Sequence, residues 1–168
     1  SQEQLDALGR GELDAGFVLA RRVPAGLRSA TIHESPFVAC LPSGHPAART
    51  RQLSLSRLRD EAFVLFSRHV SPDYHERILQ ACAQAGFDPK VRHELRHWLS
   101  VVALVSQGVG VAIVPAQLAL SGMAGVEFRP LTGTRVVSTL QCVWPQDKPN
   151  SPALDALLAL VLSMTHKA

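Results

Sequence analysis

Residues 104–115 read LVSQGVGVAIVP, and this stretch decides the fold class. It continues an apolar helix predicted for residues 98–106, which Gly108 ends, and then gives a short apolar run at residues 111–114 typical of a buried strand. Because Gly108-Val109-Gly110 precedes a strand and lacks a third glycine, it indicates a tight turn and not a dinucleotide-binding loop. A helix that leads directly into a buried strand is typical of an α/β protein.

The same alternation extends along the rest of the chain. Ser1 with Gln4 fits a capping box, which predicts a helix that begins there and runs to about Arg10. The helix predicted at 98–106 is apolar nearly all round, so we expect that helix to be buried. We predict strands at 13–19, 62–66, 91–95, 111–114 and 136–144, an extended stretch at 27–41 interrupted near Ser35-Pro36, a helix from Ser71-Pro72 to Gly86, and a final helix at 152–164. This order predicts an α/β protein with largely parallel sheets.

Composition narrows the class of protein. Hydrophobic residues make up 46% and charged residues 18% of the 168 residues, with a net charge of +3, which is globular composition with a real core. Cys40, Cys82 and Cys142 lie far apart among apolar neighbours, which indicates buried, reduced thiols and a cytoplasmic location. No apolar stretch is long enough to span a membrane, and the polar first residues do not resemble a signal peptide.

One short motif favours an enzyme. His93-Glu94-Leu95-Arg96-His97 matches H-E-x-x-H, in which two histidines on one helix face bind zinc beside a glutamate base. Here the match falls across a predicted strand-to-helix junction, where the two imidazoles should diverge. The chain also lacks a G-x-S-x-G nucleophile elbow. We therefore expect no enzyme activity, no catalytic residue, no metal and no cofactor.

Four segments, in this order, resemble the effector-binding domain of LysR-type transcription regulators. They are LGRGELDAGF at 8–17, LPSGHPAA at 41–48, AGFDP at 85–89 and LVSQGVGVAIVP at 104–115. The resemblance implies two Rossmann-like lobes joined by two crossing strands, as in periplasmic binding proteins. Lobe I would comprise residues 1–34 and 137–168, and lobe II residues 35–136.

The resemblance also implies that part of the family pattern is missing before Ser1. The DNA-binding helix-turn-helix and the first elements of lobe I would precede it, so we expect lobe I to be incomplete. An unpaired strand edge near residues 13–19 should result.

The implied function is sensing of a small effector in a cleft between the lobes, where helix N-termini attract anions. The partners would be that effector, other copies in a homodimer or homotetramer, and promoter DNA through the missing domain only, with no membrane. A solute-binding protein of a transport system is the alternative. The family pattern places effector contacts at Ser1, Ser67, Arg68, His69, Pro72, Asp73, Tyr74, Trp98 and Thr139.

Several of these residues also have structural explanations. Ser1 is a helix cap, Tyr74 fits core packing with its hydroxyl at the rim, and Trp98 fits a core anchor as well as a ligand wall. Arg68 and His69 are either solvated loop residues or partners of an anion. The basic side chains of Arg68, His69, Arg96 and His97 together favour a carboxylate-bearing effector.

Overall fold

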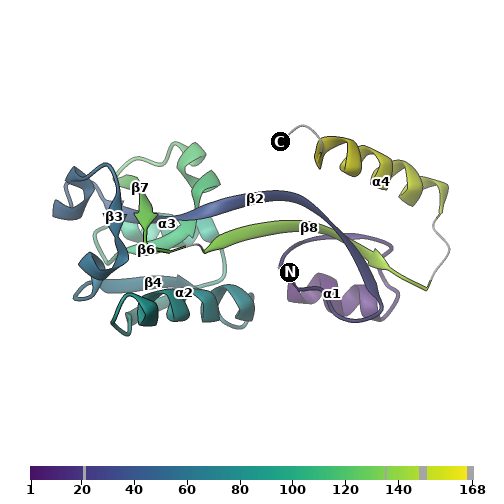
Figure 1. The fold of residues 1–168 in the computed structure, drawn as a ribbon, viewed down its shortest axis with the longest axis horizontal. Coiled ribbons are helices and arrows are strands. Elements are labelled where there is room, and N and C mark those ends of the chain that lie inside the picture. The colour runs from purple at the N-terminus through teal and green to yellow at the C-terminus, as the bar shows by residue number, and fades with distance from the viewer. Residues whose placement is uncertain (21, 135, 148–150, 166–168) are drawn as a thin grey trace. The chain divides into compact units, whose positions relative to one another are not determined.

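The chain forms two compact units in the computed structural model, which describes residues 1–20, 22–134, 136–147 and 151–165 (Figure 1). Residues 21, 135, 148–150 and 166–168, which fall within the predicted lobes, lie outside the described residues. Unit 1 is Ser1–Glu34 with Ser138–Ala168, and unit 2 is Ser35–Val137. Two long strands, β2 (Leu27–Pro42) and β8 (Val137–Pro145), each continue from one unit into the other.

A six-stranded sheet has the strand order β1-β8-β2-β7-β3, with β6 also paired to β2. Its shorter strands are β1 (Gly16–Leu19), β3 (Leu53–Ser54), β6 (Ala112–Pro115) and β7 (Val126–Thr132). The pairs β1–β8, β2–β6 and β2–β7 are antiparallel, and β3–β7 is parallel. The prediction of largely parallel sheets is therefore wrong here. Apolar runs predict that a strand is buried but not its direction, which depends on how the chain connects the strands.

Unit 1 packs one helix on each side of β1 and β8. On one side, Leu8 of α1 (Gln2–Gly9) meets Val18 and Val143. On the other, Leu154 and Leu158 of α4 (Pro152–Thr165) meet Cys142. Successive strand residues point to opposite faces of the sheet. Cys142 therefore packs against α4, and Val143 packs against α1.

The capping box predicted for α1 does not form. Ser1 is the N-cap residue, but its Oγ accepts a hydrogen bond from the Leu19 N–H at 3.0 Å and makes no cap bond. The Gln4 Oε1 likewise accepts from the Phe17 N–H at 2.9 Å. Strand β1 is terminal in the described sheet, and its edge is the one we expected to be unpaired. Two of its N–H donors are instead satisfied by the side chains of Gln4 in α1 and of the N-cap residue Ser1.

Unit 2 is built around the parallel pair β4 (Ala62–Phe66) and β5 (Lys90–Leu95). Helix α2 (Pro72–Gln84) packs Ile78 against Phe63 and Leu65, and α3 (Trp98–Ser106) packs Val101 and Val105 against Val64. The predicted start of α2 at Ser71-Pro72 is confirmed. Three short 3₁₀ helices complete the unit: η1 (Pro46–Arg49), η2 (Leu55–Leu58) and η3 (Ala116–Ser121).

Two further expectations need correction, on α3 and on β2. Helix α3 is not buried all round, because only one face packs on the strands and Leu99 is 55% exposed. Strand β2 continues through Ser35-Pro36 without interruption. Strand β7 was not predicted, because its residues are half-buried or exposed and include Pro130, which weakens the strand pattern.

Candidate functional site

Most of the predicted effector residues lie where β4 and β5 end. The strands are parallel, so their carboxyl ends meet at one edge, and the Ser67 N–H donates to the Leu95 carbonyl at 2.8 Å across it. Ser67, Arg68 and His69 follow β4 directly, and α2 and α3 begin shortly after the two strands. The carboxyl ends of parallel strands, with helices starting there, are where α/β proteins usually bind ligands.

A cluster of aromatic rings lies beside this edge. The Trp98 indole stacks on Phe66 with ring centroids 4.4 Å apart, and the Tyr74 ring meets its edge at 4.7 Å. Phe37 of β2 completes the cluster, 5.0 Å from Tyr74. The structure thus brings together Ser67, Tyr74 and Trp98. Sequence analysis missed Phe37 and Phe66 as members, although Phe66 directly precedes the predicted loop.

The Tyr74 hydroxyl is not at the rim, as we expected. The side chain is buried, and its hydroxyl donates to the Ile113 carbonyl of β6. Burial raises the pKa of Tyr74 well above its ordinary value, so the phenol stays neutral. Tyr74 therefore ties α2 to β6, and only the remaining acceptor capacity of its oxygen is left for a ligand.

Trp98 carries an unsatisfied donor. Among the described residues, its Nε1 is the buried side-chain nitrogen or oxygen that has no hydrogen-bond partner. Leaving a buried donor unpaired costs about 1–3 kcal/mol, so such atoms in native proteins require an explanation. An acceptor brought in by a ligand is one explanation, although Nε1 would first have to become accessible.

Arg68 and Asp73, two charged residues of the site, each pair with a side chain of opposite charge. The Arg68 guanidinium pairs with Glu76 at 2.7 Å, and the Arg68 N–H donates to the Glu94 Oε2 at 3.3 Å. Asp73, in the first turn of α2, pairs with Arg77 at 3.0 Å. His69 and Pro72 are exposed. Because Arg68 and Glu76 are more than half exposed, their ion pair is weak and an anionic ligand can compete with Glu76.

The two remaining predicted residues belong to unit 1, and each has a partner there. Thr139 is buried in β8 and its Oγ1 donates to Glu34 at 3.2 Å, while Ser1 accepts from Leu19. Both hydroxyls are thus already in use in the structure. Their contact with an effector stays a prediction from the family resemblance.

The H-E-x-x-H match lies on a strand and a helix start. His93 is in β5, and His97 is the N-cap residue of α3. The predicted strand-to-helix junction is confirmed, and it does not provide the single helix face that zinc binding by this motif needs. Within the described residues, no group of three or more His, Cys, Asp or Glu side chains could hold a metal ion.

The three cysteines are buried and free, as predicted. Burial raises the pKa of Cys40 and of Cys82 to about 12, with Asp88 adding to the rise at Cys82. None of the helices in the described chain is long and apolar enough to cross a membrane.

Comparison with known proteins points to one family. The model of the LysR substrate binding domain matches residues 1–165. The transcriptional regulator XapR of Escherichia coli (strain K12) is 35% identical over 158 residues, which cover 93% of this chain and 52% of XapR. The regulator IlvR of Caulobacter vibrioides is 32% identical, over 96% of this chain and 54% of IlvR. The chain thus spans about half the length of the curated relatives it matches.

The fold has a close counterpart among solved structures. The effector binding domain of BenM, solved with its effector benzoate, superposes with a TM-score of 0.82 at 18% identity, covering 99% of this chain and 75% of that one. This likeness shows the two-lobe, periplasmic-binding-protein-like α/β fold that the family resemblance implied. The relatives are transcriptional regulators, which are not enzymes, and they do not favour the transport alternative. The chain therefore belongs to the LysR substrate-binding domain family.

Proposed function

We propose that this chain senses a small carboxylate-bearing effector for a longer LysR-type transcription regulator. Units 1 and 2 would be the two regulatory lobes, with the predicted bounds 1–34 with 137–168, and 35–136. The observation that carries the proposal is that Trp98 contacts both Tyr74 and Phe66, the residue directly before Ser67, at the carboxyl ends of β4 and β5. This edge offers an aromatic wall beside the starts of α2 and α3.

The chemistry of this edge suits a carboxylate on a flat, apolar body. The Trp98 ring is half-buried and stacks on the buried Phe66, and aromatic rings bind planar apolar groups well. The first turns of α2 and α3 carry partial positive charge, and Arg68 and His69 add basic side chains. BenM, which has the same fold, binds benzoate, a ligand of this description. Its identity to this chain is too low to assign benzoate itself as the effector.

In the longer protein, the effector would shift the equilibrium between arrangements of DNA-bound copies. A ligand can do this only if it binds one arrangement more tightly than the other. We propose that promoter DNA is contacted by a separate N-terminal domain and that the regulator is a homodimer or homotetramer. We further propose a cytoplasmic location, since three buried thiols remain unpaired, and no catalytic activity.

A ligand screen of the 168-residue chain tests the charge and shape of the effector. Aromatic and dicarboxylic acids are first screened by thermal shift, since a ligand that binds only the native state raises the melting temperature. Hits are then titrated by calorimetry beside neutral amides and amines of the same shape. We expect the acids to bind at least tenfold more tightly than their amides. A preference for the amines would refute an anionic effector.

A further inference from the structure

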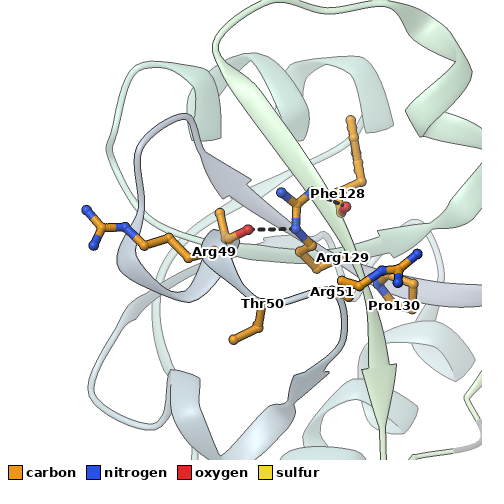
Figure 2. Close-up of a pocket in the computed structure, with 7 residues that line it drawn as sticks. Arg49, Thr50, Arg51, Phe128, Arg129 and Pro130 are labelled. Carbon is orange, nitrogen blue, oxygen red and sulfur yellow. Dashed lines mark hydrogen bonds between the residues drawn. The ribbon is translucent and has the colours of Figure 1, made fainter.

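A pocket lies in unit 2, away from the predicted effector residues. Its volume is about 300 Å³ (Figure 2). None of the nine predicted effector residues lines it. It is bounded by the end of η1 and by β7, and its lining residues are Ala48, Arg49, Thr50, Arg51, Phe128, Arg129 and Pro130.

The loop that forms one side of this pocket is firmly held. The His45 Nδ1 accepts from the Ala47 N–H at 3.1 Å, so its Nε2 carries the proton and donates to Glu61 at 3.1 Å. The Thr50 hydroxyl donates to the Ala47 carbonyl at 3.0 Å. These bonds close the loop on itself and on Glu61, so the backbone that presents Arg49 and Arg51 is already ordered.

Arg129 joins this loop to the strand on the other side. Its Nε donates to the Ala48 carbonyl at 2.7 Å, its Nη1 donates to the Phe128 carbonyl at 2.9 Å, and its Nη2 pairs with Glu127. The Arg129 guanidinium is therefore fixed in the pocket, and Glu127 balances its charge. Both sides of the pocket are therefore held by hydrogen bonds within the protein itself.

Among the described residues, no acidic side chain pairs with Arg49 or Arg51, so these two supply the uncompensated charge. Both are exposed, and Figure 2 shows their side chains extending in opposite directions on either side of Arg129. Exposed arginines change rotamer within nanoseconds, so an oxyanion in the pocket can draw either guanidinium towards it. Glu127 pairs with Arg129 alone, so the charges of Arg49 and Arg51 make the local field favour anions.

We propose that this pocket binds the oxyanion group of a small acid, a carboxylate or a phosphate, at a site separate from the effector site. Arg49 and Arg51 would hold the oxygens with charge-assisted hydrogen bonds. Phe128 and Pro130 supply apolar atoms for the rest of the ligand. Because the pocket is open, its affinity should be modest and should fall as salt is added.

The test uses the 168-residue chain and two probes, inorganic phosphate and succinate. Each is titrated at constant ionic strength while ¹⁵N NMR follows the backbone amides of residues 49–51 and the Nε–H of Arg129. We expect saturable shifts with at least one probe, and the probe that saturates identifies the source of the oxyanion. Shifts that grow linearly without saturation, or no shift with either probe, would overturn the proposal.

Variants separate binding at this pocket from general charge effects. Arg49→Gln with Arg51→Gln should weaken binding at least tenfold, and each single variant should weaken it less. Arg57→Gln, which removes an exposed arginine of η2 outside the pocket, is the matched control and should leave binding unchanged. If Arg57→Gln weakened binding as much as the Arg49 and Arg51 variants do, the effect would come from the lost net charge alone, and the proposed site would be refuted. The Ser67 amide and the Trp98 indole N–H report the effector site in the same spectra, so the two proposals fail independently.

Discussion

Gly110 offers the sharpest test of how the chain positions the candidate site. A Cβ added to Gly110 would lie 2.4 Å from the Ala62 carbonyl oxygen, well inside the 3.0 Å that real Cβ contacts keep. That oxygen accepts from the Val111 N–H at 2.8 Å, and the Val111 carbonyl accepts from Val64 at 2.9 Å. Gly110→Ala must therefore push β4 away from the residues that follow the turn.

The expected cost follows from these contacts. Overpacking alone costs about 1–3 kcal/mol, and weakening a backbone hydrogen bond adds about 1 kcal/mol. We predict that Gly110→Ala lowers the free energy of unfolding by about 3 kcal/mol. Gly108→Ala, two residues earlier, is the matched control, because its Cβ would meet nothing within 4 Å. Only the strain of its positive φ of 73° remains there, about 1 kcal/mol.

Urea unfolding measures both variants. Trp98 fluorescence follows unit 2, with Trp144 replaced by Phe in the parent and in both variants so that only one indole emits. We expect Gly110→Ala to shift the unfolding midpoint to lower urea roughly three times as far as Gly108→Ala. If Gly110→Ala cost no more than Gly108→Ala, the close approach between Gly110 and β4 would be wrong.

Three further predictions concern other parts of the chain. Trp98→Ala should cost about 3 kcal/mol in urea unfolding because it removes the ring stacked on Phe66, whereas Trp98→Phe, which keeps a ring and removes the unpaired donor, should change stability by less than about 1 kcal/mol. Gln4→Ala should speed amide hydrogen exchange at Phe17 about tenfold and leave Leu19 unchanged, and Ser1→Ala should do the reverse; equal effects at both amides would contradict the two edge contacts. The raised pKa values of Cys40 and Cys82 mean that the unfolded chain loses these thiol protons first as pH rises above 9.0, so the free energy of unfolding should fall between there and pH 12. Replacing both cysteines by Ala should make the free energy of unfolding depend less steeply on pH in this range. An unchanged pH dependence would show that other groups cause the loss of stability.

Local sequence signals were enough to predict the elements that position the effector residues. Ser71-Pro72 marked the start of α2 because proline fits the first helical turn, and the apolar run at 62–66 marked β4. The parallel pairing of β4 with β5 then explains why Phe66 and Trp98 meet beside Ser67. Sequence analysis could not show that the Tyr74 hydroxyl bonds Ile113, a residue 39 positions further along the chain.

The features that escaped prediction depend on contacts between distant residues. Ser1 and Gln4 look like a capping box, but donors of β1, 13 to 18 residues away, take their side-chain oxygens instead. Strand β7 forms although Pro130 weakens the strand pattern of its own sequence. Its backbone pairs with β2, which supplies hydrogen-bond partners for the strand. The pocket lined by Arg49, Arg51 and Arg129 could not be predicted for the same reason, because the Arg129 side chain bonds the Ala48 carbonyl, 81 residues away in the chain.

The central claim is that a carboxylate effector binds at the carboxyl ends of β4 and β5. The most direct measurement is ¹⁵N NMR of the chain titrated with the tightest acid from the ligand screen. We predict saturable shifts of the Ser67 amide and the Trp98 indole N–H, with one dissociation constant for both resonances. An acid that binds by calorimetry yet moves neither resonance would place the effector elsewhere and contradict the account.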